Sequence, residues 1–173
     1  KKLPGVYPLV LTMHYADANQ YPFSALTAQT YTYKAEPPPA EIFGRIKGAT
    51  FWKTGVITLT IKNMSDQELM VTAGLATPRE LIAELGSRAV TIAPRSERHL
   101  DFKLENFSAL SGSTYQLFAV LQFEKDGLHQ TTIVTGLAKI VENRSLFGLD
   151  YPYLVIILVG LVLIVVLFQI FKK

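Results

Sequence analysis

Apolar and polar residues alternate through most of the first 140 positions, which is the period of a β-strand. Every second residue is apolar in runs that begin at Ile57, Leu100 and Leu117. Such runs place one row of side chains on a buried face and the other row in solvent. Turn-forming residues separate them at intervals of about 8 to 12 residues, which is typical of an antiparallel sandwich. The pattern therefore predicts an Ig-like β-sandwich of about seven antiparallel strands over residues 41–145.

One segment departs from this alternation. Residues 78–85 read PRELIAEL, which favours a helical turn between two strands. Glu80 and Glu84 would then share one face of that turn, with Arg79 close by. We interpret the two glutamates as part of a solvated, charged surface.

The last part of the chain has a different pattern. From Pro152 to Phe171 only Gln169 interrupts a continuous apolar run. Twenty helical residues at about 1.5 Å each span roughly 30 Å, the thickness of the hydrocarbon core of a bilayer. The sequence thus predicts one transmembrane α-helix within residues 150–173, followed by a short cytoplasmic tail.

The flanks of this helix indicate its orientation. Lys172 and Lys173 follow the apolar run and favour the cytoplasmic side. Phe147, Tyr151 and Tyr153 precede or begin the run, as expected of an aromatic belt at the outer interface. We therefore expect a single-pass protein of the cell membrane, with the bulk of the chain on the periplasmic or extracellular side.

Two residues within the helix bear on helix association. Gly160 is the one small residue in the apolar run, so the spacing of a small-residue dimer motif is missing. Gln169 lies near the inner end, where its amide suits either a bond to a neighbouring helix or a place at the interface.

An internal repeat changes the interpretation of the N-terminus. Tyr7 corresponds to Tyr115, and at the same offset three further pairs match: Leu9 with Leu117, Met13 with Leu121, and Tyr15 with Phe123. Residues 1–35 therefore predict a β-hairpin with one apolar face, and an isolated hairpin is marginal in water. We expect it to be the end of a preceding Ig-like module, followed by a stiff proline-rich linker at 36–40. The alternative is that it pairs with this sandwich or with a partner chain.

The spacing of Leu110 and Tyr115 predicts a further detail. A leucine, a short glycine-containing turn and a tyrosine at the start of a strand are typical of a tyrosine corner. In that arrangement the phenol makes a hydrogen bond to the backbone a few residues upstream. The alternative is an ordinary strand tyrosine.

Composition excludes several classes of function. The chain has 173 residues, no cysteine and a net charge of +3, to which the two terminal lysines contribute most. It therefore lacks disulfides, thiolate metal sites and the basic balance of a nucleic-acid binder. Neither a nucleophile motif nor a phosphate-binding loop is present, and each histidine stands apart from other ligand types: His14, His99 and His129. We predict no catalytic residue, no metal, no cofactor and no small-molecule substrate.

Aromatic residues are the remaining candidates for binding, because tyrosine and tryptophan are favoured in protein interfaces. Trp52 lies in a turn with little core to fill, and Tyr21 and Phe23 flank the turn of the predicted hairpin. We expect these three residues to be possible protein contacts. Packing in a core or in an aromatic belt is the alternative.

Four stretches carry a family resemblance: VITLTIKN at 56–63, ATPREL at 76–81, TIAPRSERHLDFKL at 91–104 and STYQLFAVLQFEKDG at 113–127. They resemble prokaryotic Ig-like envelope modules of the cell-adhesion-related and alpha-galactosidase-associated type, which often end in a C-terminal membrane anchor. The resemblance implies a non-catalytic module that spaces, braces or binds. It supplies no functional residues.

Together these features predict an accessory or structural subunit of a membrane complex, with the lipid bilayer and other integral membrane subunits as partners. An adhesion or binding module at the end of a tandem array is one alternative. The chain also resembles accessory subunits of the ER translocon-associated complex, and three sequons would suit that setting: Asn63, Asn106 and Asn143.

Overall fold

The chain folds into two compact units in a computed structural model, residues 1–141 and residues 142–173. The structure describes the backbone of residues 2–36, 38–84, 86–142, 145–146 and 149–171. The side chains of 145–146, 149–152, 165, 168, 170 and 171 lie outside the description.

The first unit consists of strands. In chain order they are β1 (Gly5–Ala16), β2 (Pro22–Tyr33), β3 (Ile42–Lys47), β4 (Ala49–Phe51), β5 (Thr54–Asn63), β6 (Leu69–Ala76), β7 (Leu81–Ala83), β8 (Ser87–Ile92), β9 (Glu97–Asn106), β10 (Thr114–Lys125) and β11 (Leu128–Ile140). The second unit contains a two-stranded ladder of β12 (Ser145–Leu146) and β13 (Leu149–Asp150), and then helix α1 (Tyr151–Phe171).

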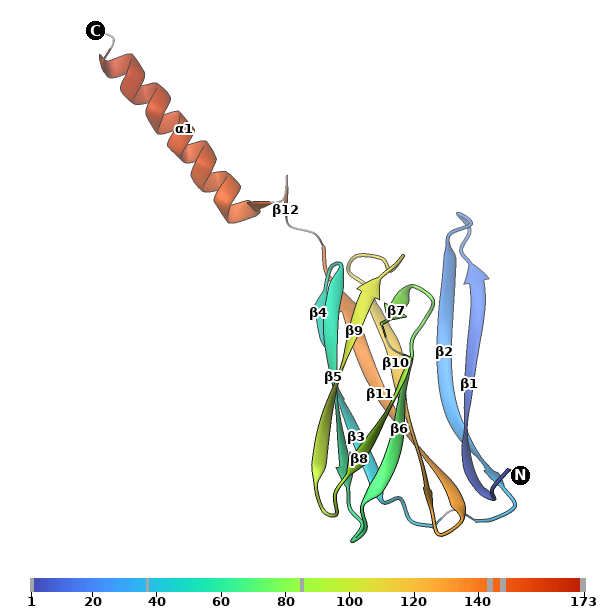
Figure 1. Cartoon of the computed structure of the whole chain (residues 1–173). Helices are drawn as coiled ribbons and strands as arrows, with labels where there is room; N and C mark the ends of the chain where they lie inside the picture. Colours follow the sequence, from blue (N-terminus) through green and yellow to red (C-terminus); the bar gives the residue numbers. More distant parts are fainter. Residues whose placement is uncertain (1, 37, 85, 143–144, 147–148, 172–173) are drawn as a thin grey trace. The chain divides into compact units, whose positions relative to one another are not determined.

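Two sheets face each other in the first unit (Figure 1). The larger has the order β2-β1-β11-β10-β6-β8, and β4 also pairs with β11. The smaller has the order β3-β5-β9-β7. Neighbouring strands are antiparallel except at the two parallel pairs, β1 with β11 and β4 with β11. The predicted all-β sandwich is therefore confirmed.

The alternation seen in the sequence explains which side chains form the core. In β5 the side chains of Ile57, Leu59 and Ile61 are fully buried, whereas the residues between them face outward. Strand β10 buries Leu117, Ala119, Leu121 and Phe123 in the same way, and its face meets β5 and β9 across the sandwich core. Burial of these rows of apolar side chains holds the two sheets together.

Two predictions about the strands need correction. Nine strands, not about seven, lie between residues 41 and 142 in the described part of the chain, because the three-residue strands β4 and β7 are too short to show a period in sequence. The helical turn predicted at 78–85 is also wrong. Among the described residues 78–84, only Leu81 closes a hydrogen-bonded turn, to Pro78, and the chain then pairs with β9 as β7.

The β10–β11 hairpin confirms the predicted tyrosine corner and contains one of the turns that separate the strands. Asp126 and Gly127 form its two-residue turn, both with positive φ, which matches the right-handed twist of the flanking strands. At the start of β10, the amide of Leu110 donates a hydrogen bond of 3.0 Å to the Tyr115 phenol oxygen. This is the predicted tyrosine corner.

Strand β10 is buried on both faces. Phe118 and Val120 point away from the sandwich core, yet they are only 5% and 7% exposed. The β1–β2 hairpin, blue in Figure 1, stands on this outer side, and β2 contacts both β10 and β11. The hairpin therefore folds over the outer side of β10 and β11 within the larger sheet.

Candidate functional site

The N-terminal hairpin joins the sandwich through one backbone pairing near its open end. Gly5 pairs with His129 of β11, and the amide of His129 donates to the carbonyl of Pro4 at 2.9 Å. Gly5 has a φ of 137°, and a Cβ at this position would collide with the main-chain oxygen of His129. Glycine is required here because only glycine permits both the dihedral angle and the close approach.

A buried carboxylate joins the other end of the hairpin to the sandwich. The Glu80 side chain is fully buried and accepts two hydrogen bonds of 2.6 Å, from the amide and the hydroxyl of Ser24. The amide of Arg79 donates to the same hydroxyl at 2.9 Å. Hydrogen bonds to a charged acceptor are about twice as strong as neutral ones, so Glu80 fixes β2 against the β6–β7 turn.

The interpretation of Glu80 as a solvated residue is wrong, because Ser24 of the hairpin packs on it and supplies two hydrogen-bond donors. Its main-chain oxygen also accepts hydrogen bonds from Phe107 and Ser108. The Tyr21 hydroxyl completes the junction by donating to the carbonyl of Ser108 at 2.9 Å. The hairpin, the β6–β7 turn and the β9–β10 loop therefore meet at one point.

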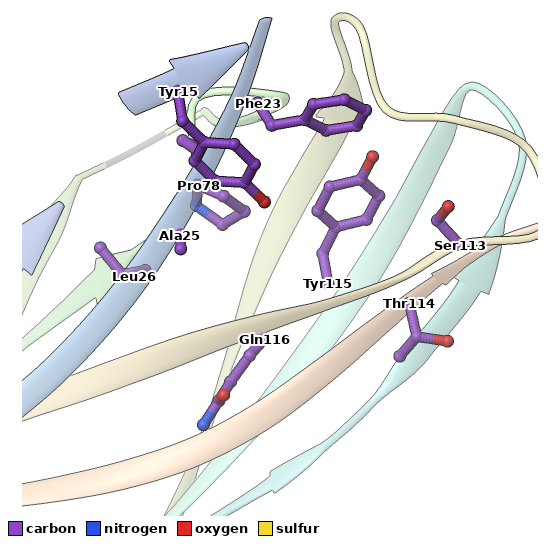
Figure 2. Close-up of a pocket in the computed structure, with 10 residues that line it drawn as sticks. Tyr15, Phe23, Ala25, Leu26, Pro78, Ser113, Thr114, Tyr115 and Gln116 are labelled. Carbon is purple, nitrogen blue, oxygen red and sulfur yellow. The ribbon is translucent and has the colours of Figure 1, made fainter. Parts of the chain in front are cut away.

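A pocket of about 310 Å³ lies beside this junction, between the hairpin and the start of β10 (Figure 2). Tyr15 and Phe23 stack with ring centroids 5.7 Å apart on the hairpin side, and Tyr115 lies on the sandwich side. Its lining is completed by Ser24, Ala25, Leu26, Pro78, Ser113, Thr114 and Gln116. None of these residues is charged, so the pocket offers rings, hydroxyls and an amide.

The phenol of Tyr115 is a structural group in this pocket. Burial raises its pKa above the ordinary value, whereas the hydrogen bond from the Leu110 amide acts in the opposite direction. Because the phenol oxygen already accepts that hydrogen bond, its role is to hold the corner. The pocket can bind a neutral group by stacking and hydrogen bonding, but its lining contains no carboxylate or amine for acid–base chemistry.

The three predicted contact residues lie near one end of the first unit. Phe23 lines the pocket and Tyr21 bonds to Ser108, as described above. Trp52 lies in the β4–β5 turn with 36% of its surface exposed, and its carbonyl accepts a hydrogen bond from the Asn106 side chain at 3.0 Å. Segment 106–109 thus connects Trp52 and Tyr21, and the Phe23 ring lies against that of Tyr21 with centroids 5.2 Å apart. No sequence spacing showed this relation.

The three histidines do not come together. His14 is exposed on β1, and His99 interacts with Thr60 across 3.0 Å on the smaller sheet. His129 stacks on Tyr7 with ring centroids 4.2 Å apart. Burial lowers the pKa of His129; nearby Glu124 opposes this effect and Lys2 adds to it. Among the described residues, no group of three or more histidine or carboxylate side chains could hold a metal ion.

Two of the three sequons have structural roles. The Asn63 side chain is fully buried, donates to the carbonyls of Gln67, Ile92 and Ala93, and accepts from Ser65. It cannot carry a glycan in this folded state. The Asn106 amide donates to the carbonyl of Ala109, as well as to that of Trp52. Asn143 lies outside the described residues.

The outer side of the hairpin is apolar and exposed. Leu9, Leu11, Met13 and Tyr15 follow one another at every second position of β1, and they are 45%, 52%, 65% and 55% exposed. Their counterparts in the repeat, on β10, form part of the sandwich core. The corresponding side chains are therefore buried in the β10 copy of the repeat and exposed in the β1 copy.

The predicted membrane segment forms helix α1. Tyr153 is exposed, Gly160 has open space where a Cβ would lie, and Gln169 is exposed near the end of the helix. Phe147, Lys172, Lys173 and the side chain of Tyr151 lie outside the described residues.

Among the described residues, no helix is both long enough and apolar enough to cross a membrane. The unbroken run of described α1 side chains covers 153–164. The transmembrane span stays a prediction from the sequence.

No family model and no curated protein sequence matches the chain. Solved structures resemble it in fold. A FixG-related protein from Vibrio parahaemolyticus has a TM-score of 0.41 and 14% identity, over 52% of this chain and 80% of that one. The cupredoxin domain of amoB from Nitrosocaldus yellowstonii has a TM-score of 0.35 and 14% identity, over 58% and 65%. The E. coli chaperone DraB has a TM-score of 0.40 and 7% identity, over 57% and 54%.

At these identities and scores the likenesses carry no argument about function.

Proposed function

We propose that this chain is a non-catalytic accessory subunit of a larger membrane complex. Helix α1 anchors it beside partner helices, and the β-sandwich braces the exoplasmic surface of the complex. A role as spacer or brace needs rigid contact surfaces and no reaction site. The hydrogen bonds at the buried Glu80 junction hold distant segments of the chain together, which supports such a role. The lining of the pocket beside this junction is uncharged, which suits a role without a reaction site.

The apolar surface of α1 carries this proposal. Four consecutive residues, Ile156, Ile157, Leu158 and Val159, are 66%, 51%, 66% and 52% exposed, and together they cover a full helical turn. A helix at the surface of a globular protein has one polar face, whereas a helix that is apolar all round belongs inside a large core or a membrane. The run from 152 to 171 has the length of a span, about 30 Å.

The orientation rests on the flanks of the helix. The two C-terminal lysines favour the cytoplasm, and the tyrosines near the start of α1 suit the outer interface. The first unit would then lie on the periplasmic or extracellular side. This arrangement gives the sandwich access to the exposed surfaces of neighbouring subunits.

Extraction in mild detergent followed by native mass analysis tests the proposal. An accessory subunit should purify in fixed stoichiometry with larger membrane proteins. A lone chain would contradict the accessory role and favour the adhesion module at the end of a tandem array. Sensitivity to glycosidases would favour the ER alternative, which the burial of Asn63 already weakens.

A pair of variants tests the anchor separately. Leu163→Arg places a charge near the centre of α1, where insertion of arginine costs about 2.5 to 3.5 kcal/mol, so the membrane-bound fraction should fall. Met70→Arg makes the same change at a position of β6 that is 69% exposed, and it should leave that fraction unchanged. Equal membrane fractions for the two variants would show that α1 is not inserted.

A further inference from the structure

The β1–β2 hairpin has two faces of different chemistry. Directly opposite residues of the two strands lie on the same side, so the twelve paired positions divide into two sets. One set contacts the sandwich through Val6 and Ser24, both buried. We call the other set the outer hairpin face; it comprises Leu9, Leu11, Met13 and Tyr15 of β1 and their partners Gln29, Thr27, Ala25 and Phe23 of β2. At the turn end of this face, Tyr15, Phe23 and Ala25 also line the pocket against the sandwich.

The outer hairpin face is uncharged, and its β1 row resembles a row of core residues. None of its eight residues is charged, and the β1 row is apolar along its whole length apart from one phenol. The solvent-exposed face of an antiparallel sheet normally carries polar residues, because water solvates them. A charged partner surface would find no ion pairs on this face. What covers it must be uncharged and apolar as well.

The internal repeat shows what covers such a face. Leu117, Ala119 and Leu121 are the β10 counterparts of Leu9, Leu11 and Met13, and all three are fully buried. Their cover is the four-stranded sheet of β3, β5, β9 and β7.

The two copies also begin alike. The Tyr7 hydroxyl donates to the carbonyl of Leu3 at 2.7 Å, as Tyr115 interacts with Leu110. Both tyrosines thus tie the start of their hairpin to the backbone just upstream. The N-terminal hairpin therefore has the corner of an Ig-like final hairpin as well as its core-facing row.

The size of the face indicates whether a sheet of the same polypeptide or a separate protein covers it. From Leu9 to Tyr15 the face covers seven residues at about 3.4 Å each, in two strands about 4.8 Å apart, and presents roughly 230 Å². A stable complex of separate proteins buries about 800 Å² on each partner. A sheet on the same polypeptide needs less, because tethering removes most of the entropy lost on association.

We infer that the outer hairpin face is the core side of a preceding Ig-like module, closed by an apolar β-sheet encoded upstream in the same polypeptide. The hairpin is then shared: its outer face completes one module, and its inner face rests on the next. This assignment stands independently of the membrane anchor, since it uses only residues of the first unit.

The rate of methionine oxidation shows whether the outer hairpin face is buried. Met13 lies on the outer hairpin face and is 65% exposed, and Met70 lies on the sandwich and is 69% exposed. In the isolated 173-residue chain, peroxide should oxidise both at similar rates, because susceptibility follows exposure. In the native protein from its source membranes, Met13 should oxidise at least about fivefold more slowly than Met70. Peptide mass spectrometry reads both sites in one sample.

The intact mass of the native chain identifies the source of the cover. Protection of Met13 in a chain heavier than 19.3 kDa by about one module supports the inference. Protection in a chain of 19.3 kDa assigns the face to a second copy or another protein and overturns it. Equal oxidation of Met13 and Met70 in the native protein also overturns it, whatever the mass. Neither result bears on α1, so failure here is distinct from failure of the accessory role.

Discussion

Replacing Glu80 with alanine should release the N-terminal hairpin from the sandwich. The carboxylate accepts two short hydrogen bonds from Ser24 and is fully buried. The variant leaves the amide and the hydroxyl of Ser24 without this acceptor, at a cost of about 1 to 3 kcal/mol for each buried group. A total near 3 kcal/mol corresponds to roughly a hundredfold increase in the opening equilibrium of the hairpin, because about 1.4 kcal/mol is tenfold.

Hydrogen exchange is the appropriate assay, because the expected loss is local. An isolated two-stranded hairpin is marginal in water, so the β1 and β2 amides should exchange once the hairpin detaches. Exchange in β5 should change little, since its core contacts involve neither Glu80 nor the hairpin. Mass spectrometry of peptides from both regions gives the two rates in one experiment.

The matched control is Glu84→Ala. Glu84 is four residues away, its side chain is 61% exposed, and its ion pair with Lys103 is 3.6 Å long. Exposed pairs contribute less than about 1 kcal/mol, so hairpin exchange should be nearly unchanged. The reasoning is refuted if Glu80→Ala leaves hairpin exchange as in the natural chain, or if Glu84→Ala accelerates it equally.

Three further substitutions test single features of the sandwich. Tyr115→Phe removes the acceptor for the Leu110 amide and should lower the free energy of unfolding in urea by about 1 kcal/mol, whereas Tyr31→Phe, at an exposed position, should not. Asn63→Ala leaves three carbonyls without a side-chain donor and should cost roughly 3 kcal/mol in the same assay, and a loss below about 1 kcal/mol would contradict this role. Burial lowers the pKa of His129, so its stabilising contribution is complete above the unfolded value of about 6.5 and is lost as the pH falls through the lower folded value. Urea unfolding between about pH 5 and 7 should therefore show a weaker pH dependence in His129→Phe than in the natural chain, and identical slopes would refute the effect.

The sequence was sufficient for features that depend on local period and turn chemistry. Alternation predicted the buried rows of β5 and β10, and turn-forming residues predicted the turn between β10 and β11, at Asp126 and Gly127. The spacing of Leu110 and Tyr115 predicted the tyrosine corner. Each of these signals is contained in about a dozen neighbouring residues, which is why no tertiary information was needed.

Features set by distant partners could not be predicted in this way. Glu80 is buried because Ser24, 56 residues away, supplies two donors, and nothing near Glu80 in the sequence indicates them. Phe118 and Val120 broke the expected alternation of β10, and the reason is the hairpin that covers them. Trp52 and Tyr21 are brought to the same loop by the strand order of two sheets. Local pattern cannot encode such relations.

The positions of the two attachments suggest what the hairpin does mechanically. Gly5 pairs with β11 near the open end of the hairpin, and Ser24 bonds to Glu80 near its turn. These points are separated by most of the length of β1, roughly 30 Å at about 3.4 Å per residue. A hairpin attached at two distant points cannot swing about either one. A module built on the outer hairpin face would therefore be held at a set angle to the sandwich, which a linker at 36–40 could not achieve alone. Rigid spacing of this kind is what a bracing subunit requires, and hydrogen exchange in Glu80→Ala tests the attachment on which it depends.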